Sequence, residues 1–256
     1  MGPEHNIQTT STRRGFLQSA AEAGAGITAA SAGITAAGFG GLFGLGLTEA
    51  HAEDSAAILD LAATAETLAA TFYYTAITGA TFRIDEWALA HLKLTMDAEL
   101  HHLDIVRSLG GASLREEFYL PDRLLADASV FVTTSLTIET ALAGAYVAAT
   151  HQLAALGQPL RAATAAQLGA SAAQHLTLIS GLAGLTPHGQ TLPAAGFHRV
   201  SDAAPALAPF LAKGAGFDGP VHVPSARQYR AALGATAAER VQPFVRAYAA
   251  ATSTTE

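Results

Sequence analysis

Glu99 and His102 are the residues whose types and spacing first point to chemistry. They lie three residues apart in the segment DAELHHLDIVRSLGG (97–111), inside a stripe of apolar residues that recur at helical spacing. Side chains three residues apart on a helix project to the same side, so these two residues can both bind the same metal ion. The sequence contains no cysteine, so a metal here must take oxygen and nitrogen ligands. The alternative is a hydrogen-bonded core pair without metal.

An internal repeat with an offset of 73 residues extends this pattern. The same offset carries Glu99 onto Ala172, where no carboxylate is present. The two halves therefore indicate one helical hairpin used twice, with a Glu on its first helix and E-x-x-H, or A-x-x-H, on its second. The identical pairs are Glu66 and Glu139, Tyr73 and Tyr146, His102 and His175, Leu103 and Leu176, and Leu109 and Leu182.

Four long helical segments are expected to position these residues, at about 54–78, 84–109, 128–156 and 159–182. The link from 111 to 127 is too long for a hairpin. Extended, it can span about 55 Å, whereas a helix of about 25 residues is about 37 Å long. We therefore expect a long crossover between two hairpins that are related by a two-fold axis. Beyond residue 184 the composition shifts to Pro and Gly, which predicts a loop-rich extension with short helices after Pro224 and at 236–250.

Three carboxylates are expected inside this bundle. Glu66 and Glu139 each lie in the middle of an apolar stripe, as Glu99 does. Burying ionised carboxylates without compensation is costly, and neither hairpin offers a Lys or Arg at mid-helix on the relevant face. The natural counter-charge is one metal ion or two. Tyr73 and Tyr146 are expected either to pack in the core or to orient a ligand.

The pattern resembles the ferritin-like carboxylate proteins, in which two helices each give a Glu and two each give a Glu-x-x-His to a di-iron or di-manganese centre. It is most similar to the exported ferritin-like family related to plant desiccation proteins, whose helices carry Glu followed seven residues later by Tyr, as in ETLAATFY (66–73) and ETALAGAY (139–146). The resemblance covers about residues 54–184 and implies an all-α, ferritin-like four-helix bundle. It also implies that one or two iron or manganese ions bind to Glu66, Glu99, His102, Glu139 and His175.

Ala172 leaves this expected site incomplete, because the resemblance places a second bridging Glu there. A single metal on the first hairpin, with a partial second site at Glu139 and His175, stays open beside a dinuclear centre, and so does an empty site. An open position on iron would permit oxygen or peroxide activation, and on manganese disproportionation. Two functions therefore remain: a redox metal protein, or a non-enzymatic stress or desiccation scaffold with a vestigial site. A third function, iron storage in a multi-subunit cage, is disfavoured because the long C-terminal tail would obstruct assembly and the metal centre is incomplete.

The N-terminus predicts export. The segment STRRGFLQ (11–18) precedes a Gly- and Ala-rich run and resembles a twin-arginine signal, with Arg13 and Arg14 as the pair and cleavage after Ala52. We expect an export signal at 1–52, the bundle at 53–184 and a C-terminal extension packed on the bundle at 185–256. A periplasmic, cell-envelope or extracellular location follows. Membrane anchoring is expected only if the signal stays uncleaved.

Charge and motifs exclude several other classes of function. The formal net charge is −7 and the sequence has no Lys/Arg cluster beyond one dipeptide, which argues against a nucleic-acid partner. It contains neither a G-x-S-x-G elbow nor a Walker loop, so no organic cofactor is expected. A homo-oligomer remains open.

Overall fold

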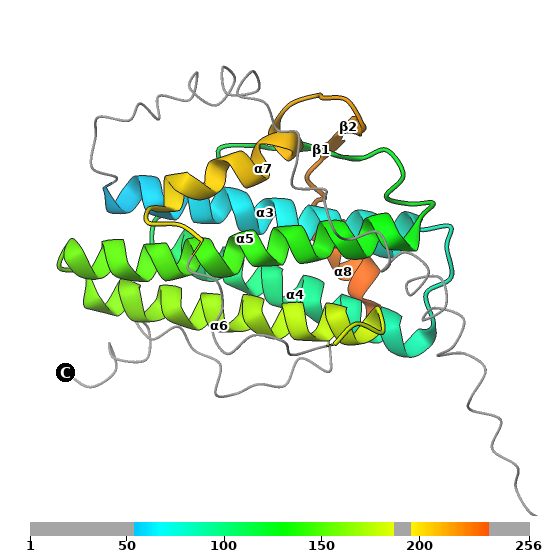
Figure 1. Ribbon diagram of the computed structural model, residues 1–256, viewed down its shortest axis with the longest axis horizontal. Helices are drawn as coiled ribbons and strands as arrows, with labels where there is room; N and C mark the ends of the chain where they lie inside the picture. Colours follow the sequence, from blue (N-terminus) through cyan, green and yellow to red (C-terminus); the bar gives the residue numbers. More distant parts are fainter. Residues whose placement is uncertain (1–53, 187–195, 236–256) are drawn as a thin grey trace, which may run out of the picture.

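The computed structural model describes residues 54–186 and 196–235, so the expected export signal (1–52) and C-terminal helix (236–250) lie outside the described residues. Four long helices run side by side along the longest axis of the molecule (Figure 1). They lie within two residues of the expected segments at each end, which confirms the all-α four-helix architecture. These helices are α3 (Ser55–Gly79), α4 (Glu86–Ser108), α5 (Ala128–Ala155) and α6 (Pro159–Leu182).

Short polar side chains determine where three of these helices begin. Asp54, Asp85 and Asp127 are N-cap residues, and each carboxylate accepts a hydrogen bond from a backbone N–H in the first turn. Helix α6 instead begins with Pro159. Proline has no backbone N–H, and at the first position of a helix this costs nothing because an N–H there would have no hydrogen-bond partner within the helix. Gly157 has a φ of 72°, which lets the chain reverse directly from α5 into α6.

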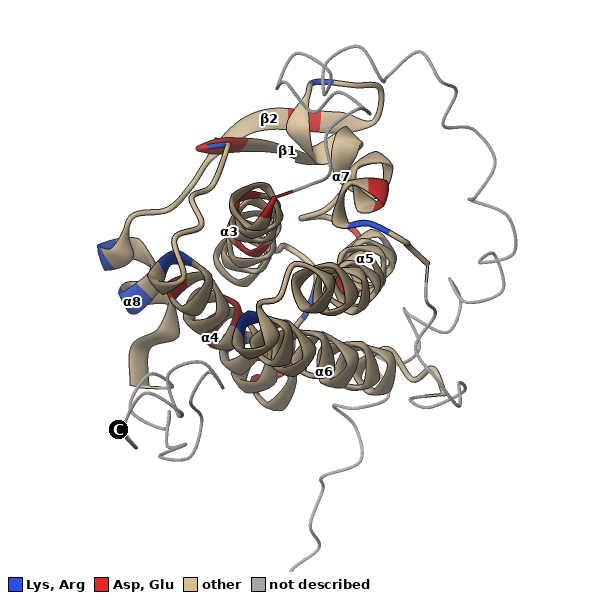
Figure 2. Cartoon of the chain, turned by 90° about the vertical axis from the view of Figure 1, so that its left-hand side faces the viewer, with Lys and Arg blue, Asp and Glu red and all other residues tan. Residues whose placement is uncertain are grey.

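The helices form two hairpins, α3 with α4 and α5 with α6. The crossover between the hairpins contains β1 (Glu117–Pro121), which pairs antiparallel with β2 (Phe217–His222). The sequence analysis did not predict this two-stranded sheet. It lies outside α3 and beside α7, and it ties the crossover to the C-terminal part of the chain (Figure 2). The paired residues are Glu117 with His222, Phe118 with Val221, Leu120 with Asp218 and Pro121 with Phe217.

Aromatic rings pack the two hairpins together. The ring of Phe72 on α3 stacks on that of Phe131 on α5, with centroids 5.5 Å apart. Tyr73 meets both rings edge-on. Such packing contributes beyond the area it buries and fixes the positions of the helices that carry the candidate site. Other large, fully buried side chains are Ile58, Leu68, Leu92, Met96, Phe118, Leu124, Ile138, Leu153 and Ile179.

Helix α5 is long and apolar. In the described part of the chain it is the one helix whose length and hydropathy would allow it to cross a membrane. However, 61% of its most apolar window is buried against the rest of the protein, as a core helix of a bundle should be.

The described C-terminal residues pack on the outside of the bundle. Val200 donates its backbone N–H to Oε1 of Gln152 on α5 at 2.8 Å. On the other side, the hydroxyl of Tyr229 lies 3.3 Å from Oγ1 of Thr71 on α3. The helix expected after Pro224 is present. The elements are the 3-10 helix η2 (Val200–Ala203), α7 (Ala204–Leu211) and α8 (Ala226–Leu233).

Candidate metal centre

The five residues singled out by their spacing come together inside the bundle, and all four long helices contribute. Glu66 lies on α3, Glu139 on α5 and His175 on α6, while α4 carries both Glu99 and His102. All five residues are buried: counted over the whole residue, the glutamates are at most 1% exposed and the histidines at most 8%. The register of the internal repeat therefore corresponds to a real gathering of side chains.

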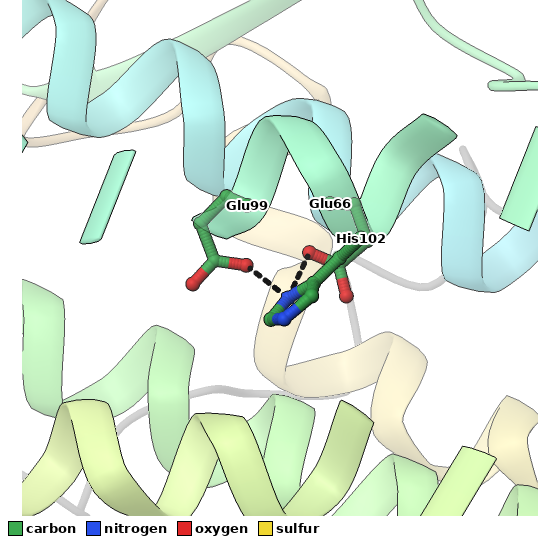
Figure 3. A group of neighbouring side chains, drawn as sticks. All are labelled: Glu66, Glu99 and His102. Carbon is green, nitrogen blue, oxygen red and sulfur yellow. Dashed lines mark hydrogen bonds and ion pairs between the residues drawn. The ribbon is translucent and has the colours of Figure 1, made fainter. Parts of the chain in front are cut away.

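The five residues form two groups of three that share one member. Glu66, Glu99 and His102 make one group, and Glu99, Glu139 and His175 make the other. Within each group, one potential ligand atom from every residue lies within 4.8 Å of the others. Figure 3 shows the first group, with the imidazole of His102 between the two carboxylates.

Glu99 serves the two groups with different oxygens. Its Oε2 lies 3.1 Å from Nδ1 of His102, and its Oε1 lies 2.6 Å from Nδ1 of His175. Each imidazole also faces the glutamate from the first helix of its own hairpin: Nδ1 of His102 is 3.6 Å from Oε2 of Glu66, and Nδ1 of His175 is 3.4 Å from Oε2 of Glu139. The two rings lie 6.0 Å apart. A carboxylate between two such groups is placed to bridge two ions.

Two tyrosines hold the outer carboxylates, and each reaches across to the opposite hairpin. The hydroxyl of Tyr73 donates to Oε1 of Glu139 at 2.7 Å, and the hydroxyl of Tyr146 donates to Oε1 of Glu66. Each outer glutamate therefore uses one oxygen for a tyrosine and turns the other toward a histidine. Sequence spacing indicated an orienting role as one alternative for these tyrosines, but it did not indicate which ligand each would meet.

Several atoms at the centre have no hydrogen-bond partner although they are buried. They are Oε2 of Glu66, Oε1 of Glu99, Oε2 of Glu139 and Nδ1 of His175. The short approach between Glu99 and His175 is too poorly aligned to count as a hydrogen bond. Buried polar atoms without partners are rare and costly, and these four belong to the two groups of potential ligands. Carboxylate oxygens and imidazole nitrogens suit iron and manganese, so the residues present fit a metal of this type.

The electrostatics of the metal-free centre depend on protons held by the imidazoles. Burial lowers the pKa of His102, but Glu66 and Glu99 outweigh burial and raise it to about 10. Burial likewise lowers the pKa of His175, yet Glu99 and Glu139 raise it well above its usual value. Burial raises the pKa of Glu99, but the charges of the two imidazoliums outweigh this and hold it well below its ordinary range.

The pKa values of the outer carboxyls, Glu66 and Glu139, are raised, whereas that of Glu99 is lowered. Burial, with a further contribution from the charge of Glu99, raises the pKa of Glu66 to about 8. The same two causes raise the pKa of Glu139. Protons therefore compensate the carboxylates when no cation does, and a metal ion entering the centre must displace them.

A family model described as a ferritin-like domain matches residues 54–185, slightly over half of the chain. The match spans the four long helices and all five clustered residues. The chain belongs to the ferritin-like domain family. No curated protein and no solved structure matches it.

Ala172 is where this ferritin-like domain departs from its own internal symmetry. It lies on α6, one turn before His175, and its side chain is buried at 3% exposure. The equivalent position on α4 is Glu99, which contacts both histidines. The ferritin-like centre thus has three carboxylates and two imidazoles, with its shared carboxylate supplied from α4 alone.

Proposed function

We propose that this chain is an exported ferritin-like protein that binds iron or manganese and supports redox chemistry on oxygen or peroxide. The observation that carries the proposal is the position of Glu99 between two groups of ligand atoms, several of them buried and without hydrogen-bond partners. Within the described residues, only protons on the imidazoles and on the outer carboxyls balance the charge of this cluster. A metal would supply that balance at the point where the ligand atoms converge.

Each residue has a distinct part in this proposal. Glu66 and Glu139 would be terminal ligands, held in place by the tyrosines that donate to their other oxygens. Glu99 would bridge, while His102 and His175 would each bind through a ring nitrogen freed of its proton. A bound iron or manganese ion would supply electron transfer to or from oxygen or peroxide. The apolar helices around the ligands would exclude bulk water.

Export by the twin-arginine route is part of the same proposal. The support is the Arg13-Arg14 pair ahead of an apolar Gly- and Ala-rich run, with an A-x-A site at 50–52. This route is associated with proteins that fold and take up cofactors before export, which suits a centre built by four helices. A periplasmic, cell-envelope or extracellular protein would result.

Ala172 favours a second candidate function. A centre that has lost a bridging carboxylate is expected to hold metal less tightly, which would suit a non-enzymatic stress or desiccation protein with a vestigial site. In that case the buried Glu and His residues would act as a hydrogen-bonded core. The two candidates differ in metal occupancy.

Metal content of the exported protein separates the two candidates. We would measure it by elemental mass spectrometry for the wild type, Glu99→Gln, His102→Ala and the control Glu86→Gln, an exposed residue of α4. One or two iron or manganese ions per chain in the wild type and in the Glu86 variant, lost from the other two, would support the redox proposal. Consumption of oxygen and peroxide would then be followed directly.

The opposite pattern would support the scaffold. A metal-free wild type that gains no ion on incubation with Fe(II) or Mn(II), and core variants that fold as well as it does, would rule out a metal function.

A further inference from the structure

We propose that the loaded centre takes a small monocarboxylate anion, such as formate or acetate, as an exogenous ligand beside Ala172. The inference rests on the proposed metal function and names the chemical class of a ligand for that site. It starts from the internal repeat, which equates Ala172 with Glu99.

The side chain that Ala172 lacks has the size of acetate. Glutamate differs from alanine by one CH₂ group and one carboxylate, which together are an acetate anion joined to the helix. Ala172 is buried and lies one turn before His175, so its side chain faces the same interior as the imidazole. An acetate ion there would place a carboxylate where the symmetry of the hairpins places one.

Unpartnered atoms in the group that contains His175 support this position. Nδ1 of His175 and Oε2 of Glu139 belong to the group on the α6 side, and both are buried without a hydrogen bond. In the α4 group, Oε2 of Glu66 is also unpartnered, but Nδ1 of His102 makes a hydrogen bond with Glu99. The imidazole without a hydrogen bond is therefore the one on the helix where the repeat has no carboxylate.

Charge selects an anion over a neutral ligand. Two divalent ions bring four positive charges, whereas Glu66, Glu99 and Glu139 bring three negative ones. The excess positive charge lies in a buried site, where an uncompensated charge is costly. One monoanion restores neutrality, as a fourth glutamate would.

Access favours a small ion. The side chains of His102 and His175 are 10% and 9% exposed, whereas those of Glu66 and Glu139 are fully buried. The side of the centre nearest to solvent is thus the one formed by α4 and α6, and Ala172 lies on α6. The narrow exposure admits an ion of two carbons more readily than a bulky carboxylate.

The test measures Mn(II) binding to the full chain by equilibrium dialysis, in sodium acetate and in sodium chloride of the same ionic strength. Even residues outside the ligand shell change metal affinity by about 10- to 100-fold. We therefore expect acetate to strengthen binding of the second Mn(II) ion by at least about tenfold. Broadening of the carboxyl resonance of ¹³C-labelled acetate by bound Mn(II) gives a second readout that does not depend on turnover.

Three substitutions at one position provide the controls. Ala172→Glu should bind the second ion without acetate and lose the acetate effect. Ala172→Leu fills the position without a charge and should lose both the effect and the broadening. Ala172→Gly leaves the position open and should keep both, so the test stands even if the glutamate variant does not fold.

Failure of this inference differs from failure of the metal proposal. If the wild type binds Mn(II) but acetate changes neither affinity nor line width, the anion site is wrong and the metal function stands. Binding of one Mn(II) ion only, in acetate as in chloride, also overturns the anion site. If no Mn(II) binds under any condition, the proposed function itself fails.

Discussion

The hydroxyl of Tyr73, on the first hairpin, donates a 2.7 Å hydrogen bond to Oε1 of Glu139 on the second. The hydroxyl of Tyr146, on the second hairpin, likewise donates to Oε1 of Glu66 on the first. Burial, and then the nearby carboxylates, raise the pKa of both tyrosines well above the usual value, so both remain neutral donors. Each hairpin thus holds the outer carboxylate of the other.

Removing one of these hydroxyls should loosen both the bundle and the centre. Tyr73→Phe leaves a buried carboxylate oxygen without its donor, so we expect the free energy of unfolding to fall by about 1–3 kcal/mol. Affinity for Mn(II) should fall by about 10- to 100-fold, because the carboxylate loses its orienting partner. Denaturant unfolding and metal titration measure the two effects. Tyr74→Phe is the control, since Tyr74 packs against Tyr229 rather than the centre, and equal losses in both variants would contradict the orienting role.

The sharing of Glu99 predicts an unequal response among the glutamates. Glu99→Gln alters a residue that belongs to both groups of ligands, so both ions should be lost. Glu139→Gln alters one group, and one ion should remain with Glu66, Glu99 and His102. Equilibrium dialysis with Mn(II) gives the two stoichiometries. Retention of one ion by the Glu99 variant would show that the carboxylate does not bridge.

The stability of the metal-free protein should fall as the pH rises above 6.5. The pKa of His102 is raised from 6.5 to about 10, by Glu66 and Glu99 against the effect of burial. The pKa of Glu66 is raised from 4.5 to about 8, chiefly by burial. Both groups bind protons more tightly in the folded state, so each contributes stability that is present below its unfolded pKa and lost as the pH rises through its folded pKa. The two losses overlap between pH 6.5 and 8.

Metal should reverse this dependence, because its ligands bind in the deprotonated form and its affinity rises with pH. Thermal unfolding at pH 6.5 and 8, in chelator and in Mn(II), checks the prediction. We expect a falling Tm in chelator and a larger gain from Mn(II) at pH 8. Glu66→Gln, which mimics the neutral carboxyl, should weaken the fall in chelator. A metal-free Tm that rises over this window would show that the imidazoles are not held as cations.

The four helices could be predicted because their signals are local. Apolar spacing identifies each helix, and the residues that cap three of them, Asp54, Asp85 and Asp127, are adjacent in sequence to the helices they cap. The pairing of β1 with β2 could not be predicted in this way. Each strand is short, the two lie about 100 residues apart, and β2 contains Gly219 and Pro220, which are unfavourable in strands.

At the site, too, features set by local sequence could be predicted and features set by long-range packing could not. Glu99 and His102 could be found by spacing, and the repeat located their partners. The pairing of each tyrosine with the opposite hairpin could not be found, because it depends on how the hairpins face one another. Glu66 and Tyr73 are two turns apart on α3, about 10 Å along the helix axis, so they cannot pair with each other.

Gly111, where the crossover begins, should not be replaceable by a larger residue without cost. A Cβ added there would lie 2.6 Å from the backbone oxygen of Leu59 on α3 and 2.8 Å from a methyl carbon of Val106 on α4. The backbone oxygen cannot move without shifting α3, which also carries Glu66. Gly111→Ala should therefore lower the free energy of unfolding by about 1–3 kcal/mol through overpacking. Gly196→Ala, where a Cβ meets open space, is the control in denaturant unfolding. Equal stability of the two variants would show that α3 can move away from the crossover without cost, and the rigid placement of Glu66 would then need another source.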